Sequence, residues 1–443
     1  MDNNKDFKVS NSLIRIIGVF ETTGRVQTTV KKFIDFKYTE ENIEPSNSFI
    51  KNYWYPEFRD IYFFKTEETS STILHKTFNK ELSFVVRTNQ DKTEKECIQA
   101  TVGDIELFLF PNNLHFFSIE LTIDSNLLSK YSDLMFCSRN FNTEITDDGK
   151  DFKWVNWIEN QVLAGIKIST DLSTKKVKVD EYSGSKFKLF TVIDLEEEIN
   201  HKKRLELLYD VGCVSKIGTA GGNETYSPSN DYFNELMKTK ISVFNNYDIL
   251  PLFDTFTVLG KGLLDGDKKS FHTATWSQLY FRIFIHNLVI KFNLFRFNSE
   301  MIDDSVKVRD QFEDFLNAYN VSHISYNFLP NLIYQEHRKT LDIEPELKKF
   351  QNRINRISQA IQEQKQSRSN LLLGVVGLFT SISSIGPILS GVNNFQQKSG
   401  LNQIVFFLLL FLLILIVSIS LFIFMFPDKA KKINRKWKQK KNN

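Results

Sequence analysis

The stretch DIELFLFPNNLHFFSIELTI, residues 104–123, predicts a β-hairpin. Both arms, residues 105–110 and 115–123, are rich in β-branched and aromatic side chains, and the Pro-Asn-Asn sequence between them is typical of a turn. Similar runs predict further strands at residues 13–20, 82–87, 162–169 and 187–192. Because helical patterns alternate with these strands, we expect an α/β or α+β fold for residues 1–270.

Helix signals follow the last of these strands. Asp194 is a residue type that favours the N-cap position, and it predicts a helix through residues 196–208. Residues 277–297 are strongly apolar, but basic side chains recur along them, namely Arg282, His286, Lys291 and Arg296. Each cation at a bilayer centre would cost about 2.5–3.5 kcal/mol, so we expect a buried amphipathic helix there and not a membrane span.

The composition is that of a folded protein. The chain has 443 residues, of which 42% are hydrophobic and 25% charged, and its 56 basic and 53 acidic residues leave a formal charge of +3. These values exclude a wholly disordered chain and a polytopic membrane bundle, and they give no indication of direct nucleic-acid binding. Three cysteines without CxxC spacing favour a reducing compartment.

The C-terminal part contains two long uncharged segments, residues 369–397 and 399–427. Residues 404–426 have only two serines as polar members, and at 1.5 Å per residue they exceed the ~30 Å hydrocarbon core. We therefore predict transmembrane helices at residues 371–392 and 403–426. Basic residues flank both outer ends, so the positive-inside rule predicts an outer loop at 393–402, a basic cytoplasmic tail at 427–443, and an inner (plasma) membrane protein with both termini in the cytoplasm.

The first predicted span has a face of small residues. Positions recurring every three or four residues place these side chains on one side of the helix: Gly374, Gly377, Ser381, Ser384, Ile388 and Gly391. Such a face is typical of close helix packing, and it is equally consistent with a pore lining in an oligomer. We take Gly377, Ser381, Ser384, Ile388 and Gly391 as the candidate pore-lining residues.

A heptad pattern precedes this span. Apolar residues recur at spacings of three and four: Leu347, Phe350, Ile354, Ile357 and Ile361. Isoleucine at successive core positions disfavours a two-stranded coil, so we expect three or more chains. Pro345 suits a first helical turn, which predicts a stalk helix from about that residue to 369, within a helical region at 271–370.

Local candidate sites are weak. Glu198 and His201 have a spacing that suits a shared metal, but a solvated helix face is the more common cause. The glycine-rich residues 218–223 suit either phosphate binding or a plain loop, and Tyr53, Trp54 and Tyr55 suit base stacking or core packing. The signatures of P-loop enzymes, zinc proteases and serine hydrolases do not occur, so we expect no enzymatic activity.

The order of these features resembles the CorA-type magnesium transporter family. The family has a Gly-Met-Asn motif at the outer end of its first span, where this chain has Gly391, Val392 and Asn393. The resemblance implies that Asn393 lies at a pore mouth and holds a hydrated divalent cation such as Mg²⁺. It also implies a homopentamer in a lipid bilayer. Valine in place of methionine and an outer loop without acidic residues depart from the family's magnesium features. The enlarged soluble domain resembles that of the CorA-like effectors of type III CRISPR systems, which respond to a nucleotide-derived second messenger.

Three hypotheses follow. The first is a homo-oligomeric CorA-like channel in antiviral defence, opened when the cytoplasmic domain binds a nucleotide-derived second messenger. The second is a constitutive divalent-cation transporter, and the third is a membrane-tethered scaffold or binding protein. The sequence does not locate the residues that bind the activating ligand.

Overall fold

The computed structural model describes most of the chain in segments. They are residues 6–22, 33–35, 52–63, 71–86, 96–111, 113–168, 186–222, 226–267, 270–301, 305–383 and 411. By packing, the chain divides into two compact units, residues 1–351 and 352–443.

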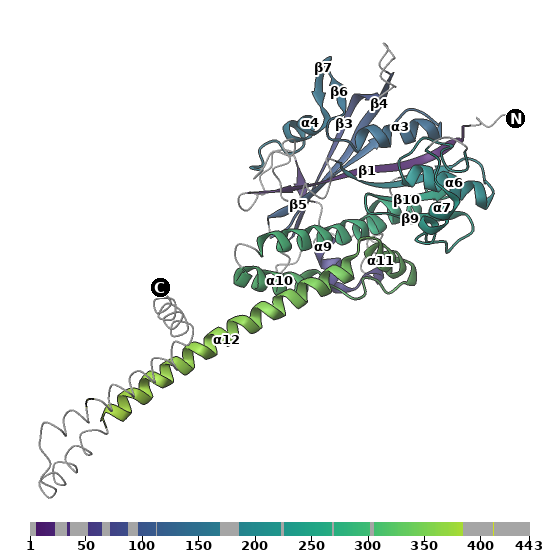
Figure 1. The fold of residues 1–443 in the computed structure, drawn as a ribbon. Coiled ribbons are helices and arrows are strands. Elements are labelled where there is room, and N and C mark those ends of the chain that lie inside the picture. Colours follow the sequence, from purple (N-terminus) through teal and green to yellow (C-terminus); the bar gives the residue numbers. More distant parts are fainter. Residues whose placement is uncertain are drawn as a thin grey trace, which may run out of the picture. The chain divides into compact units, whose positions relative to one another are not determined.

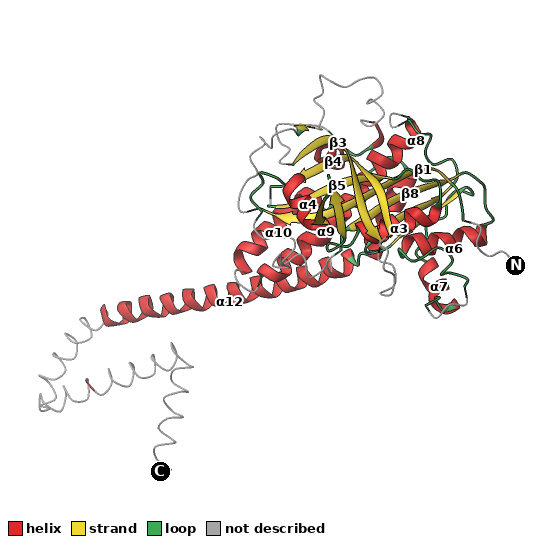
Figure 2. Ribbon diagram, turned by 90° about the horizontal axis from the view of Figure 1, so that it is seen from above, coloured by secondary structure: helices red, strands yellow, loops and turns green. Residues whose placement is uncertain are grey.

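The centre of the first unit is a mixed β-sheet. Its strands are β1 (Val9–Glu21), β2 (Ile34–Asp35), β3 (Thr72–Val86), β4 (Glu96–Leu109), β5 (Leu114–Thr122), β6 (Glu144–Asp147), β7 (Lys150–Lys153), β8 (Lys188–Leu195), β9 (Tyr247–Pro251) and β10 (Thr255–Gly260). Among the described residues the order is β7-β6-β3-β4-β5-β1-β8-β10-β9, with β2 beside β3. The pair β8 and β10 is parallel, and the other pairs are antiparallel. Figure 2 labels the central strands β3, β4, β5, β1 and β8, which lie side by side.

Helices cover both faces of this sheet (Figure 1). One face carries α3 (Leu128–Ser138), α4 (Trp154–Gln161), α6 (His201–Gly212) and α7 (Asn230–Met237). The other carries α9 (Phe281–Glu300), α10 (Ser305–Tyr319) and α11 (Phe328–Thr340), while α2 (Pro56–Tyr62) packs through Phe58 against His286 of α9. Every residue of β8 is buried, as expected for a strand covered on both sides.

The helix predicted at residues 277–297 is present and buried. A short helix α8 (Phe271–Ala274) and a π-helical turn η4 (Thr275–Tyr280) lead into α9, whose residues 281–297 are all buried. Its charges are tolerated because they are paired. Arg282 binds Glu106 of β4, and that carboxylate lies 3.2 Å from Arg15 of β1.

The strand predictions are largely confirmed. The hairpin of residues 104–123 is β4 and β5, residues 13–20 lie in β1, residues 82–86 lie in β3, and residues 188–192 lie in β8. Arg87 lies outside the described residues. The strand predicted at 162–169 is wrong for its described residues 162–168, which follow α4 as a turn and, among the described residues, form an isolated bridge from Ile168 to Thr22.

The N-cap predicted at Asp194 is also wrong. Asp194 lies in β8, and its carboxylate accepts the backbone N–H groups of Gly262, Leu263 and Leu264 at 2.7–3.0 Å. Asn200 is the N-cap of α6, and its side chain accepts from Lys203 N. Both residue types suit caps, so the sequence alone did not separate the two roles.

The predicted stalk helix is present as α12 (Ile343–Ser383), which begins two residues before Pro345 and extends further than expected. Its first turns belong to the first unit. There Lys291 of α9 lies 2.8 Å from Glu346, and Phe350 packs against Phe297 and Phe312.

The structure contradicts the predicted membrane spans. Within the described ranges, no helix is both long and apolar enough to cross a bilayer. The two transmembrane helices predicted at residues 371–392 and 403–426 are corrected accordingly, and so are the inner-membrane location and the description as a membrane channel or transporter.

Of the first predicted span, only residues 371–383 are described, as part of α12. The turns of α12 that precede them carry the charged residues Glu363, Lys365 and Arg368. The rest of both predicted spans, the loop at 393–402 and the tail at 427–443 lie outside the described residues, apart from Phe411.

Candidate functional site

The candidate residues of the predicted pore are mostly outside the described part of the chain. Gly377 and Ser381 lie in α12. Ser384, Ile388 and the predicted mouth residues Gly391, Val392 and Asn393 are not described. The pore lining and its cation site therefore stay predictions.

The glycine-rich segment forms a loop around an internal carboxylate. Asp210 of α6 accepts the backbone N–H groups of Gly218 and Ala220 at 2.7 and 2.8 Å. Burial raises the pKa of Asp210 to about 6, against the opposing effect of these two donors. The N–H groups that a phosphate would need are therefore used within the protein, which favours the plain-loop interpretation.

The remaining local candidates also have structural roles. His201 Nδ1 lies 3.7 Å from the buried carboxylate of Asp248 and 3.2 Å from Arg204, so it faces an ion pair. Trp54 is fully buried and packs on Phe58 and Phe63, as the core interpretation predicted. No group of three or more potential metal ligands of the His, Cys, Asp and Glu types occurs within the described ranges.

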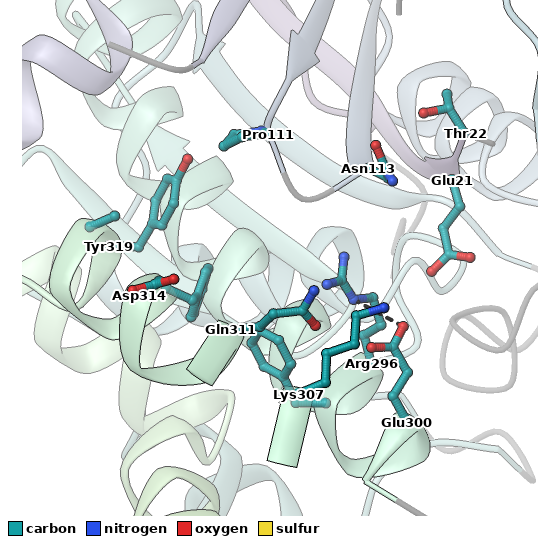
Figure 3. A pocket seen from close by; sticks show the side chains of 13 residues that line it. Glu21, Thr22, Pro111, Asn113, Arg296, Glu300, Lys307, Gln311, Asp314 and Tyr319 are labelled. Carbon is teal, nitrogen blue, oxygen red and sulfur yellow. Dashed lines mark ion pairs between the residues drawn. The ribbon is translucent and has the colours of Figure 1, made fainter. Parts of the chain in front are cut away.

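A cavity of about 690 Å³ lies on the face of the sheet that carries α9 and α10 (Figure 3). Small-molecule sites in proteins typically have this size. The end of β1 and the β4–β5 turn form one wall, and α9 and α10 form the other. The lining residues are Glu21, Thr22, Pro111, Asn113, Arg296, Phe297, Glu300, Lys307, Gln311, Asp314, Phe315, Ala318 and Tyr319.

The lining combines both signs of charge with aromatic rings. Arg296 is 8% exposed, whereas Lys307 and Asp314 lie on exposed positions of α10. Phe315 and Tyr319 are buried, and their rings stack with centroids 5.0 Å apart. This arrangement offers apolar surface and a few fixed polar groups, which is typical of a site for a small polar molecule.

The buried His115 forms hydrogen bonds at the wall of the cavity where β1 ends. His115 Nδ1 accepts the backbone N–H of Phe110 at 3.1 Å, so the proton of the neutral ring is on Nε2, which donates to Thr22 Oγ1 at 3.0 Å. Burial, and secondarily the charge of Arg296, lower the pKa of His115 to about 4. The histidine is therefore neutral at pH 7 and fixes the position of Thr22.

One lining residue connects the cavity to α12. The ring of Phe297 lies 5.6 Å from Phe312 and Phe315 of α10 and 6.2 Å from Phe350 of α12, measured between centroids. The rings of Phe312 and Phe350 are 4.5 Å apart. The wall of the cavity and the first turns of α12 therefore share one aromatic cluster.

The sequence did not predict this cavity. Its residues come from separate segments, and only the folded topology brings residues 21–22 and 111–113 next to 296–319. The available signal was the series of basic residues along 277–297, which was interpreted only as evidence against a membrane span.

Comparison of the chain with models of protein families, with curated proteins and with solved structures finds no match. The resemblance to the CorA-type family therefore rests on the quoted residues and stays a prediction. The same holds for the homo-oligomer, the nucleotide activator and the expected lack of enzymatic activity.

Proposed function

We propose that this chain is a ligand-responsive regulatory protein. A small polar molecule binds in the cavity between the strand ends and helices α9 and α10, and its binding changes the packing at the start of α12. The observation that carries the proposal is the position of Phe297, which lines the cavity and also contacts Phe350 of α12.

The aromatic cluster can transmit a change from the cavity to the start of α12, because its rings are closely packed. Phe297, Phe312 and Phe350 are each at most 1% exposed, so a ligand that shifts one ring forces its neighbours to adjust. The ion pair between Lys291 and Glu346 joins the same two helices, α9 and α12. A change in the position of α9 or α10 therefore alters the packing of the first turns of α12.

A nucleotide is the first ligand class to test. The CorA resemblance implies a nucleotide-derived activator, and the lining suits one in kind. Phe315 and Tyr319 offer ring surface for a base, while Arg296 and Lys307 offer cations for a phosphate.

The test is a thermal-shift screen of mononucleotides and dinucleotides on the full chain, with two tryptophan variants of α10. Ala318 is exposed and lines the cavity, so Ala318→Trp fills the binding space with little cost to the core. Asn317 is equally exposed but does not line it, so Asn317→Trp is the matched control. We expect a nucleotide to raise the melting temperature of the wild type and of Asn317→Trp, but not of Ala318→Trp.

The opposite pattern would refute the assignment of the site. If Ala318→Trp keeps the full shift, the ligand binds elsewhere. If no nucleotide shifts the wild type at millimolar concentration, this ligand class is excluded for the cavity.

A further inference from the structure

The side chain of Arg338 binds groups from three neighbouring segments of the first unit. Arg338 is in the last turn of α11 and is 3% exposed. A buried guanidinium is costly unless it is paired and hydrogen-bonded, because the group can hardly lose its proton. Its partners come from α11, from the residue that follows α10 and from the first turn of α12.

All three guanidinium nitrogens of Arg338 donate hydrogen bonds. Nη1 donates to the Tyr334 hydroxyl of α11 at 2.6 Å, and Nη2 donates to Asn320 Oδ1 at 2.9 Å. Nε donates to Glu344 Oε1 of α12 at 2.8 Å, and Nη2 donates to the same oxygen. Nη2 therefore binds both the residue that follows α10 and the first turn of α12.

The Tyr334 hydroxyl extends this network to the next residue after α10. It donates to Val321 O at 2.8 Å. Burial raises the pKa of Tyr334 to about 12, against the opposing effect of Arg338, so the hydroxyl keeps the proton that it donates. Arg338 is thus connected to Asn320 directly and to Val321 through Tyr334.

The end of α10 is also part of the cavity wall. Ala318 and Tyr319 line the cavity, and Tyr319 directly precedes Asn320. A guanidinium is a rigid, planar fork, so Arg338 cannot follow a displacement of Asn320 without changing its contact with Glu344. The Glu344 side chain is 61% exposed, so water replaces Arg338 there at low cost, and this contact is the one that breaks most easily.

We propose that Arg338 is a positioning residue that couples the end of α10, at the cavity, to the first turn of α12. This inference rests on the proposed function and adds a polar connection to the aromatic one. A displacement of Asn320 weakens the hydrogen bonds between Arg338 and Glu344. Because coupling between two sites is reciprocal, loss of the Glu344 contact also loosens the end of α10, and this effect is measurable without a ligand.

The test is hydrogen exchange of the full chain without ligand. Glu344→Ala removes the acceptor that Arg338 binds on α12. We expect the exchange of residues 319–321 to become about fivefold faster in this variant, because the end of α10 loses part of its support. Glu336→Ala is the matched control, because its ion pair with Lys339 at 2.6 Å does not involve Arg338, and it should leave residues 319–321 unchanged.

A double-mutant cycle separates coupling from a local effect on α12. Asn320→Ala removes only the hydrogen bond at the end of α10, and both Asn320 and Glu344 are exposed, so neither change disturbs the core. We expect the effect of Glu344→Ala on residues 319–321 to fall below about twofold in the Asn320→Ala background, because the direct connection through Arg338 is then already broken.

Three results would overturn the inference: unchanged exchange of residues 319–321 in Glu344→Ala, the same acceleration in Glu336→Ala, or a full effect in the Asn320→Ala background. The proposed function fails in a different way. If the coupling is present but no mononucleotide or dinucleotide binds, the proposed function fails and this inference stands. If a nucleotide changes the exchange of residues 343–351 but the ligand-free cycle shows no coupling, this inference fails and the proposed function stands.

Discussion

The ring of Phe117 occupies the space next to Gly18 of β1, so this position of the sheet requires a glycine. Phe117 of β5 is its cross-strand partner, and a Cβ built on Gly18 would lie 2.1 Å from Cζ of that ring. We expect Gly18→Ala to cost about 1–3 kcal/mol, because the buried ring has to leave its position. Gly103→Ala is the control, since its nearest contact would be 3.7 Å. Urea unfolding measures the difference, and equal stability of the two variants would contradict it.

The ionisation of Glu106 makes the stability of the protein depend on pH. Burial alone would raise the pKa of Glu106, but Arg282 and Arg15 hold it lower, at about 2. The ordinary pKa of a glutamate side chain is about 4.3. The contribution of ionised Glu106 to the free energy of unfolding is therefore complete above that pH and is lost as the pH falls towards about 2. We expect Glu106→Gln to cost about 3–5 kcal/mol at pH 7, because the buried Arg282 and Arg15 both lose the Glu106 carboxylate, while Arg15 keeps Glu120 at 3.1 Å.

The measurement is the urea midpoint between pH 2.5 and 7. The wild type should lose stability more steeply below pH 4.5 than Glu106→Gln does. Glu96→Gln, at an exposed position of the same strand, serves as the control and should follow the wild type. Parallel curves for the wild type and Glu106→Gln would show that the ionic cluster does not contribute in this way.

At the scale of elements, α6 and the loop after β10 depend on two different polar side chains. We expect Asn200→Ala to destabilise the protein by about 0.5–2 kcal/mol through loss of the N-cap, and Asn200→Ser to restore most of it. Asp194→Ala should cost more, because three backbone N–H groups, two of them buried, lose their acceptor. Thermal unfolding gives the order, and a larger cost for Asn200→Ala would contradict these roles.

The elements predicted from sequence were those with a strong local pattern. The hairpin arms of residues 104–123 and the strand at 187–192 are rich in β-branched and aromatic residues, and the basic residues along 277–297 correctly indicated a protein interior. Residues 162–169 have a similar apolar content, but they follow Trp154 and Trp157 of α4 and form a turn. The local sequence pattern does not distinguish a strand from a turn here, because the outcome depends on which strands pair with each other in the folded sheet.

The site was harder to predict than the elements. Arg296, Phe297 and Glu300 are consecutive or one turn apart on α9, but their role depends on Glu21 and Asn113, which the strand order places opposite them. The prediction for the C-terminal part rested on the uncharged segments at residues 369–397 and 399–427, and most of their residues lie outside the described part of the chain.

At the scale of the whole molecule, a cavity in the first unit lies beside the first turns of α12, because Phe297 lines the cavity and contacts Phe350. The aromatic cluster of Phe297, Phe312 and Phe350 is the physical link, and the position of Arg296 beside Phe297 joins ligand binding to it. A ligand that reaches Arg296 therefore lies next to the ring of Phe297, which packs against Phe350 of α12.

The most direct test is hydrogen exchange across residues 343–351, with and without a saturating amount of the nucleotide that raises the melting temperature most. We predict a changed exchange rate in this segment of the wild type, no change in α6 on the opposite face of the sheet, and a smaller change in Phe297→Leu at equal occupancy. Binding that leaves the exchange of residues 343–351 unaltered would contradict the account.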